Sequence, residues 1–300
     1  MLVVIGGSTA SGKSALALTL AQRWGGTIVN ADSQQLYRDL PILSARPTPE
    51  DEAAAPHLLY GVLGADEQAS VGRWLKLIAP VLANAIATDN TLILTGGTGL
   101  YIEALLHGLP AIPPVDPEVR RTLRASAVAM PASDLHARLA VVDPLAAGRL
   151  APTDTQRILR ALEVVQSTGR SLADWQQEPR ARACLPARVI GVALLPSAEV
   201  VAPKIEGRLR AMLQGGAIKE VEALFQAHSD LATYPIAKLH GCRELIAVYD
   251  GRLTLAEAES RIAAQVRQYA RRQRTYFRHR LPELVVVEQS GQSEGILALR

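Results

Sequence analysis

The stretch "LVVIGGSTASGKS", residues 2–14, decides the fold of this chain. An apolar run leads into two glycines, and from Gly7 onward the sequence fits the pattern G-x-x-x-x-G-K-S/T. In this pattern glycines let backbone N–H groups close around phosphate oxygens, the lysine adds a positive charge, and the final hydroxyl can bind magnesium. The motif therefore predicts a phosphate-binding loop, with Mg²⁺ as the cofactor and Ser14 as its ligand.

The context of this motif predicts an α/β fold of the P-loop type. A helix-forming segment, "KSALALTLAQRW", follows the loop, and the N-terminus of such a helix favours a bound anion. A doubly wound parallel sheet is expected because short apolar runs recur along the chain, as in strands that are buried on both faces. The expected further strands are residues 27–31, 91–96, 188–195 and 283–288.

A helical insertion domain is expected within this core. The proline-rich segment "LPAIPPVDPE" at 109–118 opens a region of helical patterns without a convincing strand, and "LPAR" at 185–188 closes it. Within it, Thr153 and Gln156 have capping-box spacing, and Gly169 is expected to end that helix. The predicted domains are a catalytic core of residues 1–112 and 186–300 and an insertion of residues 113–185.

Composition narrows the class of protein. Most of the basic side chains are arginines, which suit phosphate and base contacts, although a GC-rich genome would produce the same bias. The two cysteines form no metal-like cluster, the N-terminus lacks a charged segment before its apolar run, and no apolar run approaches the ~18 residues of a membrane span. We therefore expect a soluble, reduced, cytoplasmic protein without a membrane partner. Composition does not determine the oligomeric state, for which we expect a monomer.

Two further segments carry polar groups to the edge of the predicted sheet. Asp32, in "NADSQQLY" after the second strand, lies where open α/β folds bind ligands, and could bind magnesium or accept a substrate proton. A turn or helix-cap aspartate is the alternative. "GGTGLY" at 96–101 follows the third strand and offers closely approaching backbone with a free Thr98 hydroxyl; a plain strand-to-helix turn fits equally.

The last long helix is strongly basic. It is expected to begin with the capping box Thr254-x-x-Glu257 and to end near Arg280, before Pro282. Its segment 261–280 contains seven arginines and no carboxylate. Solvated faces normally mix charges for i,i+4 pairing, so a face with one sign indicates contact with nucleic acid or diphosphate. The residues that share this face are Arg267, Arg271, Arg274 and Arg278.

A series of motifs resembles one enzyme family, the tRNA dimethylallyltransferases, also called isopentenyl-diphosphate:tRNA transferases. The resemblance spans nearly the whole chain. Its motifs, in order, are "GGSTASGKS", "NADSQQLY", "ARPTPED", "GGTGLY", "TDTQRILRALEV", "RLRAMLQGGAIKEVEAL" and "VRQYARRQRTYFR". The family resemblance implies transfer of a dimethylallyl group from dimethylallyl diphosphate to the exocyclic amine of the adenosine 3′-adjacent to the tRNA anticodon.

The resemblance also implies roles for individual residues. Asp32 would take a proton from the attacking amine, while Thr9, Lys13 and Arg208 would act on the departing diphosphate. The adenine must leave the base stack of the anticodon loop to be reached. The implied diphosphate-binding residues are Gly7, Ser8, Thr9, Ala10, Ser11, Gly12, Lys13 and Ser14.

Contacts with tRNA are implied at four further segments, and the insertion would grip the anticodon stem. Ser8, "APTD" at 151–154 and Cys242 depart from the family pattern; Cys242 has no neighbour that would activate it as a nucleophile. The implied tRNA-binding residues are Asp32, Ser33, Gln34, Gln35, Thr98, Gln156, Arg157, Ile158, Leu159, Arg160, Lys238, Leu239, His240, Gly241, Cys242 and Arg243, together with the four arginines of the last helix.

Three alternatives remain open at this point. The phosphate loop alone would suit a kinase that transfers phosphate from ATP to a metabolite, and such an enzyme needs neither an insertion nor an arginine helix. A prenyltransferase acting on free adenine nucleotides keeps the chemistry but leaves the insertion unused. A binding-only nucleotide switch is disfavoured by Asp32 beside the loop.

Overall fold

The computed structural model describes residues 1–228 and 230–288. The chain divides into two compact units, one formed by Met1–Leu106 with the chain from Ala183 onward, the other by His107–Arg182. The smaller unit starts and ends a few residues earlier than the predicted 113–185. It includes strands β5 (Leu109–Pro110) and β6 (Arg180–Ala181), an antiparallel pair that was not expected, because two-residue strands carry no periodic signal.

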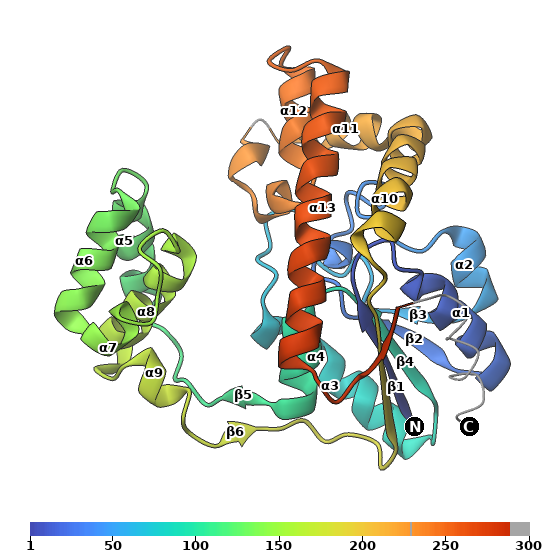
Figure 1. Ribbon diagram of the computed structural model, residues 1–300, viewed down its shortest axis with the longest axis horizontal. Helices are drawn as coiled ribbons and strands as arrows, with labels where there is room; N and C mark the ends of the chain where they lie inside the picture. The colour runs from blue at the N-terminus through green and yellow to red at the C-terminus, as the bar shows by residue number, and fades with distance from the viewer. Residues whose placement is uncertain (229, 289–300) are drawn as a thin grey trace. The chain divides into compact units, whose positions relative to one another are not determined.

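The larger unit is built on a six-stranded parallel sheet (Figure 1). The strand order is β3-β2-β4-β1-β7-β8, and each described pairing in the sheet is parallel. The five predicted strands are confirmed, and the short β3 is an addition. Their observed bounds are β1 Leu2–Gly7, β2 Thr27–Asn30, β3 His57–Leu58, β4 Leu92–Gly96, β7 Val189–Leu194 and β8 Val285–Val287.

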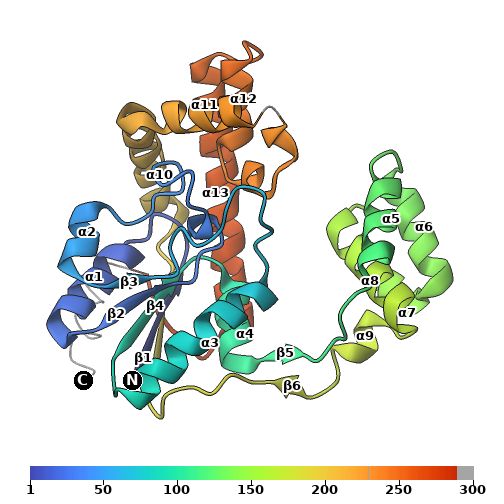
Figure 2. The same ribbon diagram turned by 180° about the vertical axis from the view of Figure 1, so that it is seen from behind.

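Alternate residues of each strand serve two separate hydrophobic clusters, one on each face of the sheet. On β1, Val4 packs in a cluster with Trp74 of α3, whereas Val3 and Ile5 pack in another with Leu20 of α1. This alternation follows from the two-residue repeat of a strand. The sheet is therefore covered on both faces, and Figure 2 shows α3 and α4 in front of the strands.

The helices of the larger unit follow the strands in chain order. The capping box of Thr254 and Glu257 is confirmed at the start of the longest helix, which ends at Arg280 as predicted. The helix bounds are α1 Lys13–Trp24, α2 Pro49–Ala54, α3 Val71–Ala87, α4 Gly99–His107, α10 Ala198–Met212, α11 Ile218–Ala227, α12 Cys242–Tyr249 and α13 Leu255–Arg280, with short helical turns at Gln34–Leu36, Leu213–Ala217, Leu231–Thr233 and Pro235–Lys238.

The smaller unit has a helical core of its own. Buried leucines and alanines from four helices pack together, among them Leu123, Leu139 and Leu162. The N-cap of α8 is Asp154, whose side chain accepts from Arg157 N, so the predicted capping box at Thr153 is wrong by one residue; Gly169 ends the helix as predicted, with φ 67°. The helices are α5 Pro117–Ala127, α6 Ala132–Val142, α7 Pro144–Ala147, α8 Thr155–Thr168 and α9 Leu172–Trp175.

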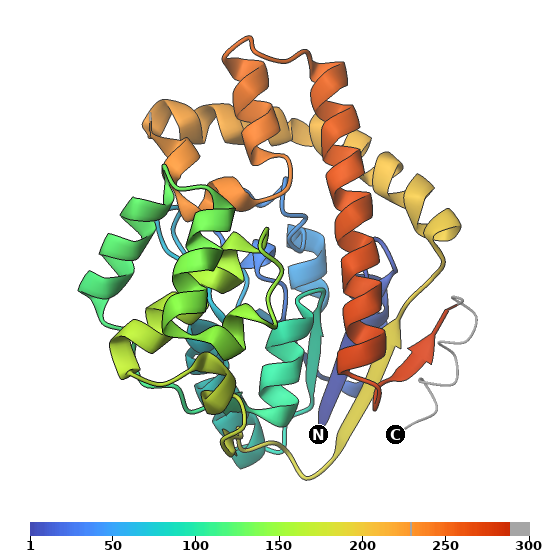
Figure 3. The same ribbon diagram turned by 60° about the vertical axis from the view of Figure 1, so that its left-hand side comes forward.

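Long helix α13 lies at the carboxyl ends of β1 and β4, and its course is visible in Figure 3. A Cβ on Gly6 would lie 2.2 Å from Phe277, and a Cβ on Gly99 would lie 2.4 Å from Tyr276. These glycines permit the close approach of the helix. In the described part of the chain, no helix has the length and apolar composition needed to cross a membrane.

Candidate active site

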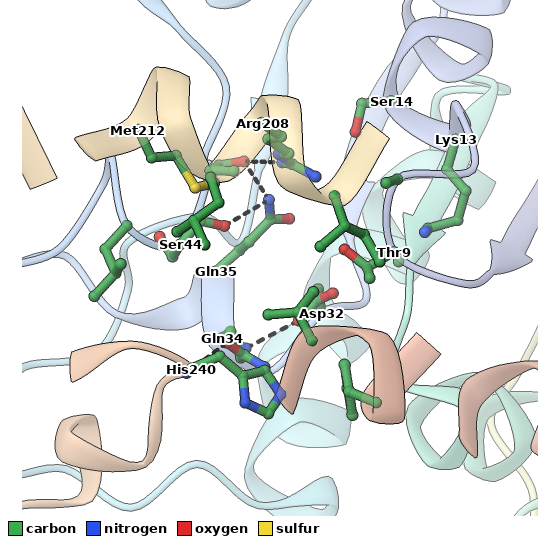
Figure 4. Close-up of a pocket in the computed structure, with 18 of the residues that line it drawn as sticks. Thr9, Lys13, Ser14, Asp32, Gln34, Gln35, Ser44, Arg208, Met212 and His240 are labelled. Atoms are coloured by element: carbon green, nitrogen blue, oxygen red, sulfur yellow. Dashed lines mark hydrogen bonds between the residues drawn. The ribbon is translucent and has the colours of Figure 1, made fainter. Parts of the chain in front are cut away.

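A pocket opens at the carboxyl edge of the sheet, where the loops after β1, β2 and β4 meet (Figure 4). Parallel strands all end at this edge, so residues far apart in sequence converge there. The pocket brings together Thr9, Lys13, Asp32 and Arg208, the four residues to which the sequence analysis gave catalytic roles. Ser14, the predicted magnesium ligand, lies on the same wall.

The phosphate loop has the backbone conformation that its glycines allow. Gly7 has φ 141°, and a Cβ there would lie 2.2 Å from the carbonyl oxygen of Leu194 on the neighbouring strand. Gly12 has φ 95° and directly precedes α1, so the positive end of that helix faces the loop. Lys13 Nζ donates a 2.5 Å hydrogen bond to Ser8 O and so spans the loop. This arrangement is suited to an anion.

The surroundings of Lys13, in the phosphate loop, change the pKa of its ammonium group. Burial lowers the pKa of Lys13 to about 8; Arg208 acts in the same direction and Asp32 opposes both. Among the described residues that line the pocket, Asp32 alone carries a carboxylate. The pocket therefore holds two cationic side chains and one anionic side chain around one cavity.

Asp32 forms hydrogen bonds that stabilise a turn, and it also lines the pocket. Its backbone N–H donates to Asn30 Oδ1 at 2.7 Å, and its Oδ1 accepts from Gln34 N at 3.0 Å. The alternative interpretation as a turn aspartate is therefore correct for one carboxylate oxygen. Gly97 lies against the other, since a Cβ on Gly97 would be 3.1 Å from Asp32 Oδ2. The turn orients the carboxylate, and within residues 1–228 and 230–288 no side chain donates a hydrogen bond to Oδ2.

Thr98 has a different role from the one expected. Its Oγ1 accepts from Ser33 N at 2.9 Å and donates to Ser33 Oγ at 3.2 Å, so the hydroxyl is not free. The glycines around it pack against protein, because a Cβ on Gly96 would lie 2.1 Å from Ala31 backbone. The segment "GGTGLY" therefore supports the turn that carries Asp32.

The two glutamines after Asp32 are anchored to neighbouring loops. Gln34 Oε1 accepts from His240 N at 3.2 Å, and Gln35 Nε2 donates to Ala45 O at 2.5 Å. Arg208 Nη2 approaches the same Ala45 oxygen at 3.5 Å (Figure 4). Both glutamines line the pocket, and each keeps part of its amide available there.

Sequence reasoning missed the apolar wall of the pocket. Helices α10 and α13 face each other across it and contribute side chains at helical spacing. Tyr269 also lines it, with its ring centroid 4.8 Å from that of His240, whose pKa is lowered by burial and then by Arg272. The apolar lining residues are Leu43, Ile205, Leu209, Met212, Ile262 and Val266. For the members on α10 and α13 the helical spacing was readable in the sequence, but not which cavity they face; Leu43 comes from the loop between β2 and α2.

Comparison with known proteins identifies the family. The model of the IPP transferase family matches residues 35–280. The chain belongs to this family. It is 51% identical to a tRNA dimethylallyltransferase of Rhodopseudomonas palustris over 94% of this chain and 87% of that protein.

Solved structures of the IPP transferase family have the same fold. A full-length tRNA isopentenylpyrophosphate transferase from Bacillus halodurans is similar with a TM-score of 0.69 and 28% identity, covering 99% of this chain and 93% of that one. A eukaryotic dimethylallyltransferase acting on tRNA superposes with a TM-score of 0.82 over 100% of this chain and 80% of that one; at 21% identity this likeness concerns the fold. The predicted P-loop-type α/β architecture agrees with both.

Some residues expected to touch tRNA are buried in this IPP transferase. Leu239 and Cys242 are 4% and 0% exposed, so their side chains pack in the core, and contact of this segment with tRNA stays a prediction. Burial raises the pKa of Cys242 to about 12, which leaves the thiol inert. The exposed side chains of this segment are Lys238 and Arg243.

The segment "QRILR" lies on α8 of the smaller unit. Ile158 is 0% exposed and its side chain belongs to the helical core, while contact of this segment with tRNA stays a prediction. Arg157 pairs with Asp154, and Arg160 lies 3.8 Å from the buried carboxylate of Glu163. Gln156 and Arg157 of this segment are exposed, whereas Leu159 and Arg160 are partly buried, and Leu159 packs against the helical core.

Three arginines on the basic face of α13 form ion pairs with carboxylates, whereas the sequence analysis expected this face to be free for nucleic acid or diphosphate. Arg267 Nη1 lies 2.9 Å from Glu206 on α10, and Arg274 lies 3.4 Å from Glu288, which also pairs with Arg278. These partners come from other segments of the chain, so inspection of the helix alone could not reveal them. Three of the four arginines therefore tie α13 to its neighbours.

Arg271 differs from the other three. Its guanidinium has no ion-pair partner within residues 1–228 and 230–288, and the side chain is exposed. Of the four arginines on this face, Arg271 is therefore the one whose unpaired charge still indicates contact with nucleic acid or diphosphate.

Proposed function

We propose that this protein transfers a dimethylallyl group from dimethylallyl diphosphate to the exocyclic amine of the adenosine 3′-adjacent to the anticodon of tRNA, releasing diphosphate. The observation that carries the proposal is the single pocket that joins a phosphate loop, one carboxylate and an apolar wall. Membership of the IPP transferase family and the names of the relatives support it. The phosphate loop, Asp32 and the apolar wall are compatible with action as a monomer, which we propose.

The geometry suits a displacement reaction in which the phosphate loop binds the diphosphate, the group that leaves. The phosphate loop and Lys13 would hold the diphosphate, and Arg208 and Thr9 would contact it as negative charge develops. The apolar wall on α10 and α13 would shelter the five-carbon tail. Asp32 would accept the proton of the attacking amine, which makes that weak nucleophile competent as the new bond to carbon forms.

Magnesium fits the donor set at this loop. The Ser14 hydroxyl is a hard oxygen ligand on the pocket wall. Within the described residues there is no cluster of histidine, cysteine, aspartate and glutamate side chains that could cage a metal. The ion would therefore be held by Ser14 together with oxygens of the diphosphate and water, as is usual for Mg²⁺. When bound, Mg²⁺ would neutralise part of the negative charge of the diphosphate.

The acceptor would enter beside Asp32. The amides of Gln34 and Gln35 and the ring of Tyr269 border the space in which a flipped adenine would lie. Exposed cations at Lys238, Arg243 and Arg271 would contact the phosphate backbone, together with accessible residues of α8 in the insertion. This proposal leaves the buried members of the implied tRNA set as packing residues.

The defining experiment is a transfer assay with two acceptors, tRNA and AMP, together with a separate test for phosphate transfer from ATP. The protein is incubated with dimethylallyl diphosphate, Mg²⁺ and unmodified tRNA with adenosines at the third anticodon position and its 3′ neighbour, and the digest is read by mass spectrometry. We expect prenylated adenosine at the neighbouring position and none with AMP as acceptor. Phosphate transfer from ATP without tRNA would instead establish a kinase, and prenylation of AMP would establish a nucleotide prenyltransferase.

Donor affinity should depend on pH through Lys13. The pKa of this group is about 8 in the free protein, so above pH 8 the ammonium must regain a proton before it can pair with the diphosphate. By linkage, the Kd for the donor should rise by up to about tenfold per pH unit above pH 8 and stay flat below it. Calorimetry in two buffers of different ionisation enthalpy measures the proton uptake. A flat profile in wild type, or an equally steep one in Lys13→Met, would contradict this assignment.

A further inference from the structure

Gln273 connects the two glycine-rich loops of the pocket, although it belongs to neither. It lies in the third turn from the end of α13, and its side chain is 4% exposed. Its Oε1 accepts a 2.8 Å hydrogen bond from the backbone N–H of Thr9, in the phosphate loop. Its Nε2 donates a 2.9 Å hydrogen bond to the carbonyl oxygen of Gly97, in the loop after β4. One amide thus spans the donor side and the acceptor side of the site.

Only one orientation of this amide satisfies both loops. Thr9 offers an N–H and Gly97 offers a carbonyl, so the amide oxygen must face the first and the amide nitrogen the second. The contact is tight, because a Cβ on Gly97 would lie 2.1 Å from Gln273 Nε2. An isosteric side chain lacking either the acceptor or the donor would leave a buried backbone group without a partner.

Of the two loops that Gln273 joins, one is the proposed diphosphate loop and the other packs against Asp32, which lies in the loop after β2. Thr9 is placed against the leaving diphosphate, and Gly97 packs against the free oxygen of Asp32, the proposed proton acceptor. A displacement requires the leaving group and the nucleophile to keep a fixed separation, and an error of about 1 Å can reduce the rate by about 10²-fold. The spacing of Thr9 from Asp32 is therefore a quantity on which turnover depends.

We propose that Gln273 is a positioning residue that sets the distance between the donor diphosphate and the base-activating carboxylate, acting through Thr9 and Gly97. This inference rests on the proposed function and adds to it a role for Gln273, a residue of the motif "VRQYARRQRTYFR" to which the resemblance gave no role. It also explains why α13 approaches so closely: Tyr276 and Phe277 on the same helix hold it against Gly99 and Gly6, which fixes the backbone from which Gln273 reaches.

The test uses two substitutions of matched size. Gln273→Met removes both hydrogen bonds. Gln273→Glu keeps the acceptor for Thr9 N but, while ionised, places a carboxylate oxygen against the Gly97 carbonyl. Once protonated, the same side chain donates to Gly97 and restores both bonds. Burial raises the pKa of a carboxyl group in such a place, so the restoring form is reached at mildly acid pH.

We expect Gln273→Met to lower kcat for tRNA prenylation by about 10²-fold at every pH, with tRNA affinity unchanged. For Gln273→Glu, the ratio of its kcat to that of wild type should rise toward one as the pH is lowered from 8 to 6. Tyr269 on the same helix and Asp32 beside Gly97 also face this position and are present in both variants, so Gln273→Met is the reference for Gln273→Glu at each pH. The matched controls are Gln268→Met and Gln268→Glu, at an exposed position of α13, which should behave as wild type.

A purely structural role would give a different result. If Gln273 only stabilised the fold, both variants would lose melting temperature and tRNA binding together, and protonation would not restore kcat. Wild-type kcat in Gln273→Met, or a Gln273→Glu variant no faster than Gln273→Met at pH 6, would overturn the proposal. Failure of the wild-type protein to prenylate tRNA would overturn the proposed function instead, so the two failures are distinguishable.

Discussion

Asp32→Asn should lower kcat for tRNA prenylation by about 10²–10⁴-fold, the usual contribution of a positioned general base. The substitution is chosen because asparagine keeps the Oδ1 that accepts from Gln34 N, so the turn that carries the residue is preserved. Only the negative charge and the second acceptor oxygen are lost. The affinity for tRNA and the KM for the donor should both stay within about twofold, because an interaction made only in the transition state affects kcat alone.

The control for this prediction is Asp89→Asn. Asp89 is exposed in the loop before β4 and has φ 48°, a conformation that asparagine adopts readily. This variant should retain wild-type kcat. Single-turnover measurements with saturating donor and tRNA separate the chemical step from product release. Full activity in Asp32→Asn would remove this carboxylate from the mechanism and leave the turn as its role.

Lys13→Met should lower kcat/KM for dimethylallyl diphosphate by about 10²–10³-fold, the cost of removing one preorganised group from a developing negative charge. Methionine fills a similar volume but cannot pair with the diphosphate or donate to Ser8 O. Binding of tRNA alone should be unchanged, because Lys13 lies at the phosphate loop and not on the exposed cationic surface. Filter binding with labelled tRNA and steady-state kinetics with varied donor give the two quantities.

Lys76→Met provides the matched control for charge. Lys76 is exposed on α3, away from the pocket lining, so its loss changes net charge equally and should leave kcat/KM at the wild-type value. If both lysine variants weakened the donor reaction alike, the effect would be one of overall charge. If Lys13→Met reacted normally, the donor would have to be held without this ammonium, by the backbone N–H groups of the loop together with Thr9 and Arg208.

Local sequence signals predicted the elements of this protein well. Apolar runs located five of the six sheet strands, and the Thr254 and Glu257 capping box located the start of α13, because each signal acts within a few residues. The phosphate loop is equally local, since the glycines and Lys13 that shape it are consecutive in the chain. Expectations that depended on a partner elsewhere in the chain were less successful.

The arginine face shows why. Within α13 the positive charges have no carboxylate, and the pattern therefore indicated a free cationic surface; the partners Glu206 and Glu288 come from α10 and from the segment after β8. In the same way, Ile158 and Cys242 lie in motifs associated with tRNA contact, but tertiary packing buries both completely. Burial depends on which faces meet, and a motif does not carry that information.

The amino-acid sequence by itself determined the order of strands and helices, the phosphate loop and the membership of a family, because these depend on neighbouring residues and on ordered motifs. Tertiary structure alone decided what surrounds the reacting groups. The hydrogen bond from Thr9 N to Gln273 joins residues 264 positions apart. Parallel strands bring such distant residues to one edge of the sheet, and close packing there selects which side chain reaches which loop.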